Sequence, residues 1–273
     1  MTASREPVTA ELTTYRYVRF ALLALLLALA ISVAAETVRD GWQTSISAYY
    51  YTAAGPVFIG ALTAIGVCLI ALRGFTDAED VCLNLAGISA PMVAFVPTPE
   101  EGRSPDVHAI VNNASTFLAV LAIGYVVVLV ALARKPTRPS RWAALGLVAT
   151  AVAWGVGAIW LASDRDFFAA HAHGLAAVFT FVPFAGVVLL NTDWGVRVLA
   201  TEADASRTRF DGAYWGVIAA MAVVCVGALA LHRWEFVLLA TEVALLSLFA
   251  LFWLLQSIDL MDPRRDQASA SSR

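Results

Sequence analysis

Long apolar segments alternate with short polar ones along the chain, a pattern that is typical of a protein that crosses a membrane repeatedly. A membrane-spanning helix needs about 20 predominantly apolar residues. The first apolar run covers residues 20–35 and follows Arg16 and Arg19. Seven more runs predict helices over residues 55–72, 81–96, 107–133, 142–162, 167–190, 212–231 and 235–256. The pattern therefore predicts an all-α polytopic bundle of about eight transmembrane helices.

The two ends of the chain set the predicted domain limits. Residues 1–17 are polar and predict a disordered cytoplasmic tail, residues 18–257 form a single predicted transmembrane helical domain, and residues 258–273 are a second cytoplasmic tail. The first helix has an alternative interpretation, because a basic stretch, an apolar run and a Ser-x-Ala ending also describe a signal peptide that is cleaved. The later helices would keep their orientation in either case.

The run at residues 81–96 has the weakest pattern. Its roughly 16 apolar residues would extend about 24 Å as a helix, and the run contains Asn84 and Pro91. Two interpretations fit these features, a spanning helix and a re-entrant segment. The basic residues favour the spanning helix, because a re-entrant segment here would place every later loop on the opposite side of the membrane.

The basic residues also predict the orientation of the bundle. With a cytoplasmic amino terminus, 14 of the 18 Lys and Arg residues fall in cytoplasmic segments. The clearest of these segments is the loop at 134–141, RKPTRPSR. Cytoplasmic loops of membrane proteins carry such an excess of positive charge. We therefore expect both termini in the cytoplasm.

Composition supports a membrane location and limits the range of possible partners. The chain is 60% hydrophobic and 14% charged, with a mean hydropathy of +0.73, whereas soluble domains carry about 25% charged residues. A net charge of −3 and the absence of a basic stripe exclude nucleic acid as a partner. Lys135 is the single lysine, and this preference for arginine favours a GC-rich bacterial genome. The expected location is the bacterial cytoplasmic (inner) membrane, with the lipid bilayer as the main partner; the oligomeric state is left open.

Six polar residues are predicted to share a shallow layer at the outer ends of three helices. An ionisable residue within a spanning helix costs roughly 2.5 to 3.5 kcal/mol on insertion scales, so Glu242 needs a partner or a water-filled cavity. The layer therefore indicates a polar pocket that opens to the outer face. Its members are His108, Asn112, His171, His173, Glu235 and Glu242.

Three functions are compatible with this layer. The first is binding or transport of a small molecule or lipid through the pocket, with Glu242 as the buried charge. The second is a metal-dependent intramembrane hydrolase acting on lipid, in which His108, His171 and His173 hold zinc. The third is a structural subunit of a membrane complex, in which the layer has no function of its own.

The spacing of the histidines weighs against the metal site. His171 and His173 are about 200° apart on a regular helix and cannot both face one metal unless the first turn is irregular. In the same stretch Asp166 is expected to cap the sixth predicted helix, and Pro183 is expected to kink it.

A helical hairpin at residues 45–98 carries the most specific motifs. It contains the segments SISAYYYT, PVFIG, RG and NLAG. The order Ser-x-Ser-x-Tyr-Tyr, Val-Phe-x-Gly, Arg-Gly and Asn-x-Ala-Gly resembles a widespread group of uncharacterised bacterial multi-pass integral-membrane proteins. This resemblance implies a membrane fold and no particular activity.

A second resemblance involves the start of the fourth predicted helix. Ser104, His108 and Asn112 stand four residues apart. The spacing is similar to the Ser-x-x-x-His-x-x-x-Asp motif of the alkaline ceramidase and adiponectin-receptor-like membrane hydrolases. The resemblance implies a zinc ion held by this helix together with a His-x-x-x-His pair. The chain departs from that pattern, because Asn112 replaces the acid and the two later histidines are two residues apart.

Overall fold

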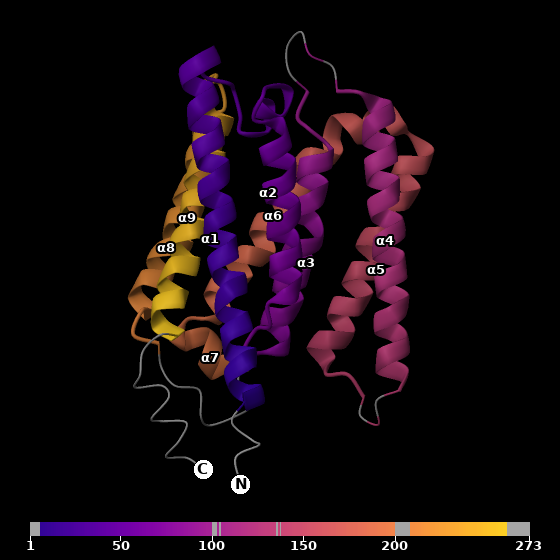
Figure 1. Ribbon diagram of the computed structural model, residues 1–273, viewed down its shortest axis with the longest axis vertical. Coiled ribbons are helices and arrows are strands. Elements are labelled where there is room, and N and C mark those ends of the chain that lie inside the picture. Colours follow the sequence, from indigo (N-terminus) through magenta and orange to yellow (C-terminus); the bar gives the residue numbers. More distant parts are fainter. Residues whose placement is uncertain are drawn as a thin grey trace. The chain divides into compact units, whose positions relative to one another are not determined.

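The computed structural model describes residues 6–99, 103, 105–134, 136, 138–199 and 208–260, and this part of the chain is helical with no β-strand (Figure 1). Seven helices are long and apolar enough to cross a membrane. An eighth apolar helix, α2 (Gly55–Ala71), has 17 residues. The predicted polytopic helical bundle is therefore confirmed. The seven long helices are α1 (Glu6–Asp40), α3 (Asp77–Phe95), α4 (Val107–Ala133), α5 (Arg141–Ser163), α6 (Arg165–Leu190), α8 (Asp211–Ala230) and α9 (Val237–Leu260).

The first helix starts earlier than the sequence predicts. α1 begins at Glu6, so the predicted disordered tail is helical from that residue onward, while residues 1–5 lie outside the described part. Pro7 does not interrupt the helix. The N–H groups of the first turn make no bond within a helix, so the N–H that proline lacks is not needed there. Two short helices, η1 (Ser47–Tyr51) and α7 (Asp193–Leu199), complete the fold.

The helices form two compact units. Unit 1 consists of the described residues within 1–46 and 184–273, and unit 2 consists of those within 47–183. The division falls inside α6, directly after Pro183. Unit 1 is therefore built from two separate parts of the sequence, and unit 2 is continuous.

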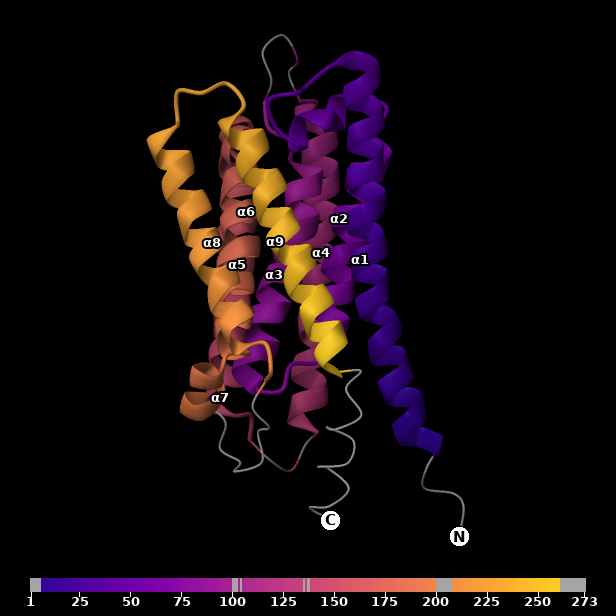
Figure 2. The same cartoon turned by 90° about the vertical axis from the view of Figure 1, so that its left-hand side faces the viewer.

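In unit 1, α9 packs against both α1 and α8 (Figure 2). Phe184 of α6 joins this packing, with its ring centroid 4.5 Å from Phe249 and 5.5 Å from Phe252 of α9. The start of α1 and the end of α9 lie at the same end of the unit (Figure 1). This arrangement agrees with the prediction that both termini lie on one side of the membrane.

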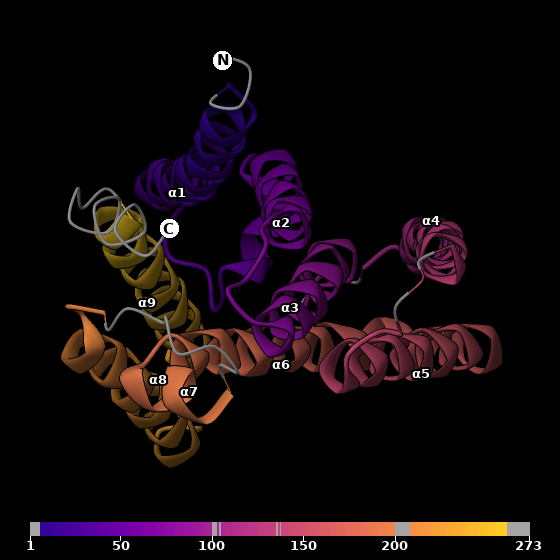
Figure 3. The ribbon, with the colours of Figure 1, turned by 90° about the horizontal axis from the view of Figure 1, so that it is seen from below.

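In unit 2, α3 contacts α2, α4 and α5 (Figure 3). α3 is a continuous helix of 19 residues, about 28 Å long. It does not turn back on itself, which favours the spanning helix over the re-entrant segment at this position. An apolar cluster joins Ile110 of α4, Leu161 of α5 and Phe168 of α6 near the predicted outer ends of these helices.

Candidate functional site

Glu242 lies in the second turn of α9 and is half-buried. Its Oε2 accepts a hydrogen bond from the backbone N–H of Ile46, with a distance of 2.5 Å between the two atoms. One turn earlier, the N–H of Leu239 donates to the carbonyl oxygen of Thr44 at 3.0 Å. Glu242 therefore helps to hold the segment that follows α1 against α9, and this contact supplies the partner that the carboxylate requires.

Glu235 does not belong to the same helix as Glu242. The sequence predicts a helix from residue 235, but α9 begins at Val237, and Glu235 is exposed in the preceding turn. The prediction that both carboxylates lie on one helix over residues 235–256 is therefore wrong. The turn before α9 is longer than the sequence predicts, because the N–H groups of Trp234 and Val237 bond to carbonyl oxygens three residues earlier.

His173 is a buried residue of α6, with 7% of its surface exposed. Its Nδ1 lies 2.7 Å from the carbonyl oxygen of Val96 and 3.1 Å from that of Val93. Carbonyl oxygens only accept hydrogen bonds, so Nδ1 carries a proton. Both carbonyls belong to the carboxyl end of α3, where backbone acceptors have no helical partner. His173 therefore caps α3 and ties α6 to it.

His171, two residues earlier, is exposed. Its Nδ1 bonds to the carbonyl oxygen of Phe167 at 3.0 Å, and its ring lies 4.2 Å from the Phe167 ring. His108 and Asn112 are also exposed, and neither side chain has a hydrogen-bond partner among the described residues. Three of the predicted site residues thus face away from the packed interior of unit 2.

The caps of α4 and α6 are both aspartates. Asp106 Oδ1 accepts from the N–H of His108 at 2.9 Å and begins α4. Asp164 Oδ1 accepts from the N–H of Phe167 at 2.9 Å. The predicted cap Asp166 is therefore wrong, because α6 starts at Arg165 and a cap must precede the first helical residue.

The six predicted residues do not share one unit. His108, Asn112, His171 and His173 belong to unit 2, and Glu235 and Glu242 belong to unit 1. Among the described residues, no group of three or more His, Cys, Asp or Glu side chains is arranged to hold a metal ion. Ser104, the first residue of the hydrolase-like motif, lies outside the described part of the chain.

The hairpin that carries the more specific motifs is held by a close glycine contact between α2 and α3. A methyl group added at Gly66 would lie 2.5 Å from the carbonyl oxygen of Gly87, and one added at Gly87 would lie 2.7 Å from that of Gly66. Such distances are below van der Waals contact, so larger residues would force the helices apart. Small residues at facing positions allow this approach in membrane helices.

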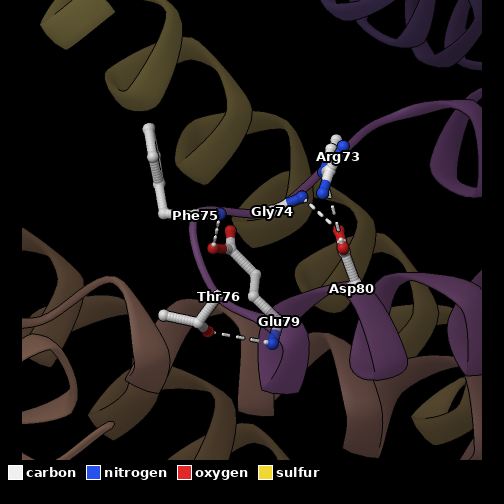
Figure 4. A network of polar contacts seen from close by, with 6 residues as sticks. All are labelled: Arg73, Gly74, Phe75, Thr76, Glu79 and Asp80. Atoms are coloured by element: carbon white, nitrogen blue, oxygen red, sulfur yellow. Dashed lines mark hydrogen bonds and ion pairs between the residues drawn. The ribbon is translucent and has the colours of Figure 1, made fainter. Parts of the chain in front are cut away.

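The turn between α2 and α3 is fixed by two carboxylates (Figure 4). Glu79 is buried, and its Oε2 accepts from the N–H of Phe75 at 2.8 Å. Asp80 Oδ1 accepts from the N–H of Gly74 at 2.5 Å. The hydroxyl of Thr76 caps α3 by accepting from the N–H of Glu79 at 3.2 Å. The acidic turn therefore has a structural role.

The other end of the hairpin is closed by hydroxyl groups. The hydroxyls of Ser47 and Thr98 are hydrogen-bonded to each other. Tyr51 donates to the carbonyl oxygen of Thr98 at 3.3 Å, and Tyr49 is fully buried. η1, which contains most of the Ser-x-Ser-x-Tyr-Tyr motif, is thus hydrogen-bonded to the segment that follows α3.

Sequence reasoning missed two buried charged residues on α1. Arg19 was an orientation signal in the sequence, but it is 2% exposed, and Glu36 near the other end of the helix is also buried. The leucines at positions 22, 26 and 29 are buried at alternating spacings of four and three residues. Arg19 and Glu36 continue the same helical face, and this spacing is the signal that could have found them.

A scan against protein-family models, a search of curated proteins and a search of solved structures found no match to this chain.

Proposed function

We propose that this protein is a multi-pass protein of the bacterial cytoplasmic membrane that binds a small molecule or lipid at its outer face. The observation that carries the proposal is the exposure of His108, Asn112 and His171 at the predicted outer ends of α4 and α6. His173 and Glu242, by contrast, each hold two parts of the fold together. The first three side chains are therefore the ones available to a ligand.

The lengths of the helices support a ligand at the level of the lipid headgroups. α4 has 27 residues and is about 40 Å long, whereas the hydrocarbon core of a bilayer is about 30 Å thick. The last 20 residues of α4, 114–133, are almost entirely apolar and match that thickness. His108 and Asn112 precede them, so we place both residues among the outer headgroups.

The chemistry of these residues fits a polar or anionic group. The Nδ1 of His171 donates to a carbonyl, which leaves Nε2 as an acceptor in the neutral ring. A protonated imidazole at His108 or His171 donates to phosphate oxygens, and the amide of Asn112 both donates and accepts. We therefore propose binding as the primary activity, because the three groups lie at one end of the helices.

The proposal is tested by lipid retention. The full chain is prepared in vesicles of phosphatidylcholine mixed with phosphatidylglycerol, extracted, and examined by native mass spectrometry. We expect the double variant His108→Ala, His171→Ala to retain less phosphatidylglycerol than wild type. His232→Ala is the matched control, because His232 is also exposed and its Nδ1 also bonds to a backbone carbonyl, that of Leu229.

Equal phosphatidylglycerol retention by wild type and the double variant would remove support for an anionic lipid as the ligand. A second arm with a zwitterionic lipid alone separates headgroup recognition from general lipid adhesion. Stoichiometric zinc in the wild type, lost in the double variant, would instead favour the metal-dependent hydrolase.

A further inference from the structure

Four buried polar side chains lie at the predicted cytoplasmic end of unit 1. None of them belongs to the proposed outer site. We call them the inner polar cluster: Arg19 of α1, Asn191 directly after α6, and Trp253 and Gln256 of α9. The Nε2 of Gln256 donates to Oδ1 of Asn191 at 2.7 Å. The guanidinium carbon of Arg19 lies 5.1 Å from the centroid of the Trp253 ring. Trp253 and Gln256 are three residues apart on α9, so the two pairs lie on one face of that helix.

The guanidinium of Arg19 is oriented by aromatic rings. It lies 4.4 Å from the centroid of Tyr15 as well as over Trp253, and its Nη2 donates to the Tyr15 hydroxyl. Cation–π contacts of this kind are stronger when they are removed from water. A planar guanidinium held in one orientation suits the recognition of carboxylate or phosphate oxygens. The cluster thus contains a buried and oriented positive charge.

Two other polar atoms of the cluster point to a ligand. Trp253 is 1% exposed and Gln256 is 2% exposed. Within the part of the chain that the structure describes, neither the indole N–H of Trp253 nor Oε1 of Gln256 has a hydrogen-bond partner. Buried polar atoms are nearly always paired with protein, water or ligand, since leaving one unpaired costs about 1 to 3 kcal/mol. The cluster therefore offers an unpaired donor on the ring that lies against Arg19, and an unpaired acceptor about one helical turn further along α9.

We infer that the inner polar cluster binds a phosphate-type oxyanion that carries a hydroxyl group. The guanidinium of Arg19 and the indole N–H of Trp253 donate to the oxyanion, and the hydroxyl donates to Oε1 of Gln256. A phosphatidylglycerol headgroup has this chemistry, and so does protonated inorganic phosphate. The two sources share one mode of recognition.

The depth of the cluster suits both sources. The apolar span of α1 that begins at Thr13 has 28 residues and is about 42 Å long, some 12 Å longer than the hydrocarbon core. Arg19 lies about 9 Å along the helix from Thr13. This position is close to the inner edge of the hydrocarbon, where lipid phosphates and cytoplasmic anions meet. Tyr15 lies one turn nearer the cytoplasm and covers the guanidinium from that side.

The test measures thermal unfolding of the full chain in phosphatidylcholine nanodiscs. One arm adds inorganic phosphate against chloride at equal ionic strength, and the other replaces part of the phosphatidylcholine with phosphatidylglycerol. A ligand that binds the folded state raises the unfolding midpoint in proportion to its occupancy. A shift in the first arm identifies free phosphate as the source. A shift in the second arm identifies the lipid headgroup where substitutions in the inner polar cluster reduce it, because phosphatidylglycerol at the outer site would shift those variants and wild type alike.

Four variants decide the assignment. We expect Arg19→Gln to weaken the apparent affinity about tenfold or more, and Trp253→Phe, which keeps an aromatic ring under Arg19, to weaken it about fivefold. Arg16→Gln removes an exposed charge from the same helix, and Trp215→Phe removes an exposed indole from α8, so both should bind as wild type does. The inference is overturned if neither source shifts the wild type, or if Trp253→Phe and any folded Arg19→Gln protein bind as tightly as wild type.

Discussion

The Nδ1 of His173 lies 2.7 Å from the carbonyl oxygen of Val96, and this bond joins the first half of α6 to the end of α3. The same nitrogen lies 3.1 Å from the carbonyl oxygen of Val93. One side chain thus satisfies two backbone acceptors that the helix leaves unpaired. His171, two residues away, makes no contact of this kind and is exposed.

Replacing His173 is expected to destabilise the protein. His173→Ala leaves the buried carbonyl oxygen of Val96 and the half-buried one of Val93 without this donor, at a cost of about 1 to 3 kcal/mol. The unfolding midpoint in nanodiscs measures the loss. His171→Ala is the matched control and should unfold within about 0.5 kcal/mol of wild type. Equal loss in both variants would contradict the capping role of His173.

Glu242 is expected to tolerate loss of its charge better than loss of its oxygen atoms. Glu242→Gln keeps an acceptor for the N–H of Ile46, whereas Glu242→Leu removes it and should cost about 1 to 3 kcal/mol. Unfolding of the two variants under the same conditions gives the comparison. If Glu242→Gln is as damaging as Glu242→Leu, the negative charge itself is required.

The glycine contact between α2 and α3 is expected not to tolerate even one added methyl group without loss of stability. Gly87→Ala would place a carbon 2.7 Å from the carbonyl oxygen of Gly66, and overpacking of this kind costs typically 1 to 3 kcal/mol. Gly60→Ala on α2 meets no atom within 4 Å and serves as the control. Thermal unfolding checks both, and a stable Gly87→Ala protein would show that the two helices separate easily.

The cap of α6 distinguishes two neighbouring aspartates. Asp164→Ala should cost about 1 kcal/mol, because the N–H of Phe167 loses its acceptor. Asp166→Ala should have a smaller effect, limited to its favourable position near the positive end of the helix dipole. If Asp166→Ala destabilised the protein more than Asp164→Ala, Asp166 rather than Asp164 would be the cap.

Trp154 of α5 is expected to strengthen the pairing of α4 with α5. Its indole N–H donates to the carbonyl oxygen of Leu118 at 2.8 Å, and Tyr125 of α4 donates to that of Leu147 of α5 at 3.1 Å. Interhelical hydrogen bonds in membranes contribute about 0.6 kcal/mol on average. Trp154→Phe should therefore lower stability by about that amount, and Trp142→Phe, at an exposed position near the start of α5, should not.

The helices were predictable from the sequence because a bilayer requires long apolar segments, and the lengths of those segments are visible residue by residue. Helix starts were less predictable. α1 begins at Glu6 and α9 at Val237, since both starts depend on local backbone bonds that hydropathy does not report. Asp164 and Asp166 are both suitable caps by residue type, and their position relative to Arg165 decided between them.

The roles of the candidate site residues were harder to predict from the sequence than the helices were. His171 and His173 look alike in the sequence, and they differ because the carbonyl oxygen of Val96, 77 residues earlier, is the acceptor for one of them. Glu242 finds its donor at Ile46, 196 residues away. Contacts between such distant positions arise from tertiary packing, which helical periodicity alone does not specify. The inner polar cluster was missed for the same reason, since Arg19 reads as a flanking charge until α9 packs against it.

The assembly of unit 1 from two distant parts of the chain has a consequence for biogenesis. α1 emerges from the ribosome before any part of unit 2, whereas its partner α9 is made only after all of unit 2. At about 5 to 20 residues per second, synthesis of the intervening chain takes on the order of ten seconds or more. During that interval α1, with Arg19 and Glu36 on its future contact face, resides in the membrane without the helix that will cover it. Unit 2 needs no such wait, so its helices can pack before the protein as a whole has left the insertion machinery.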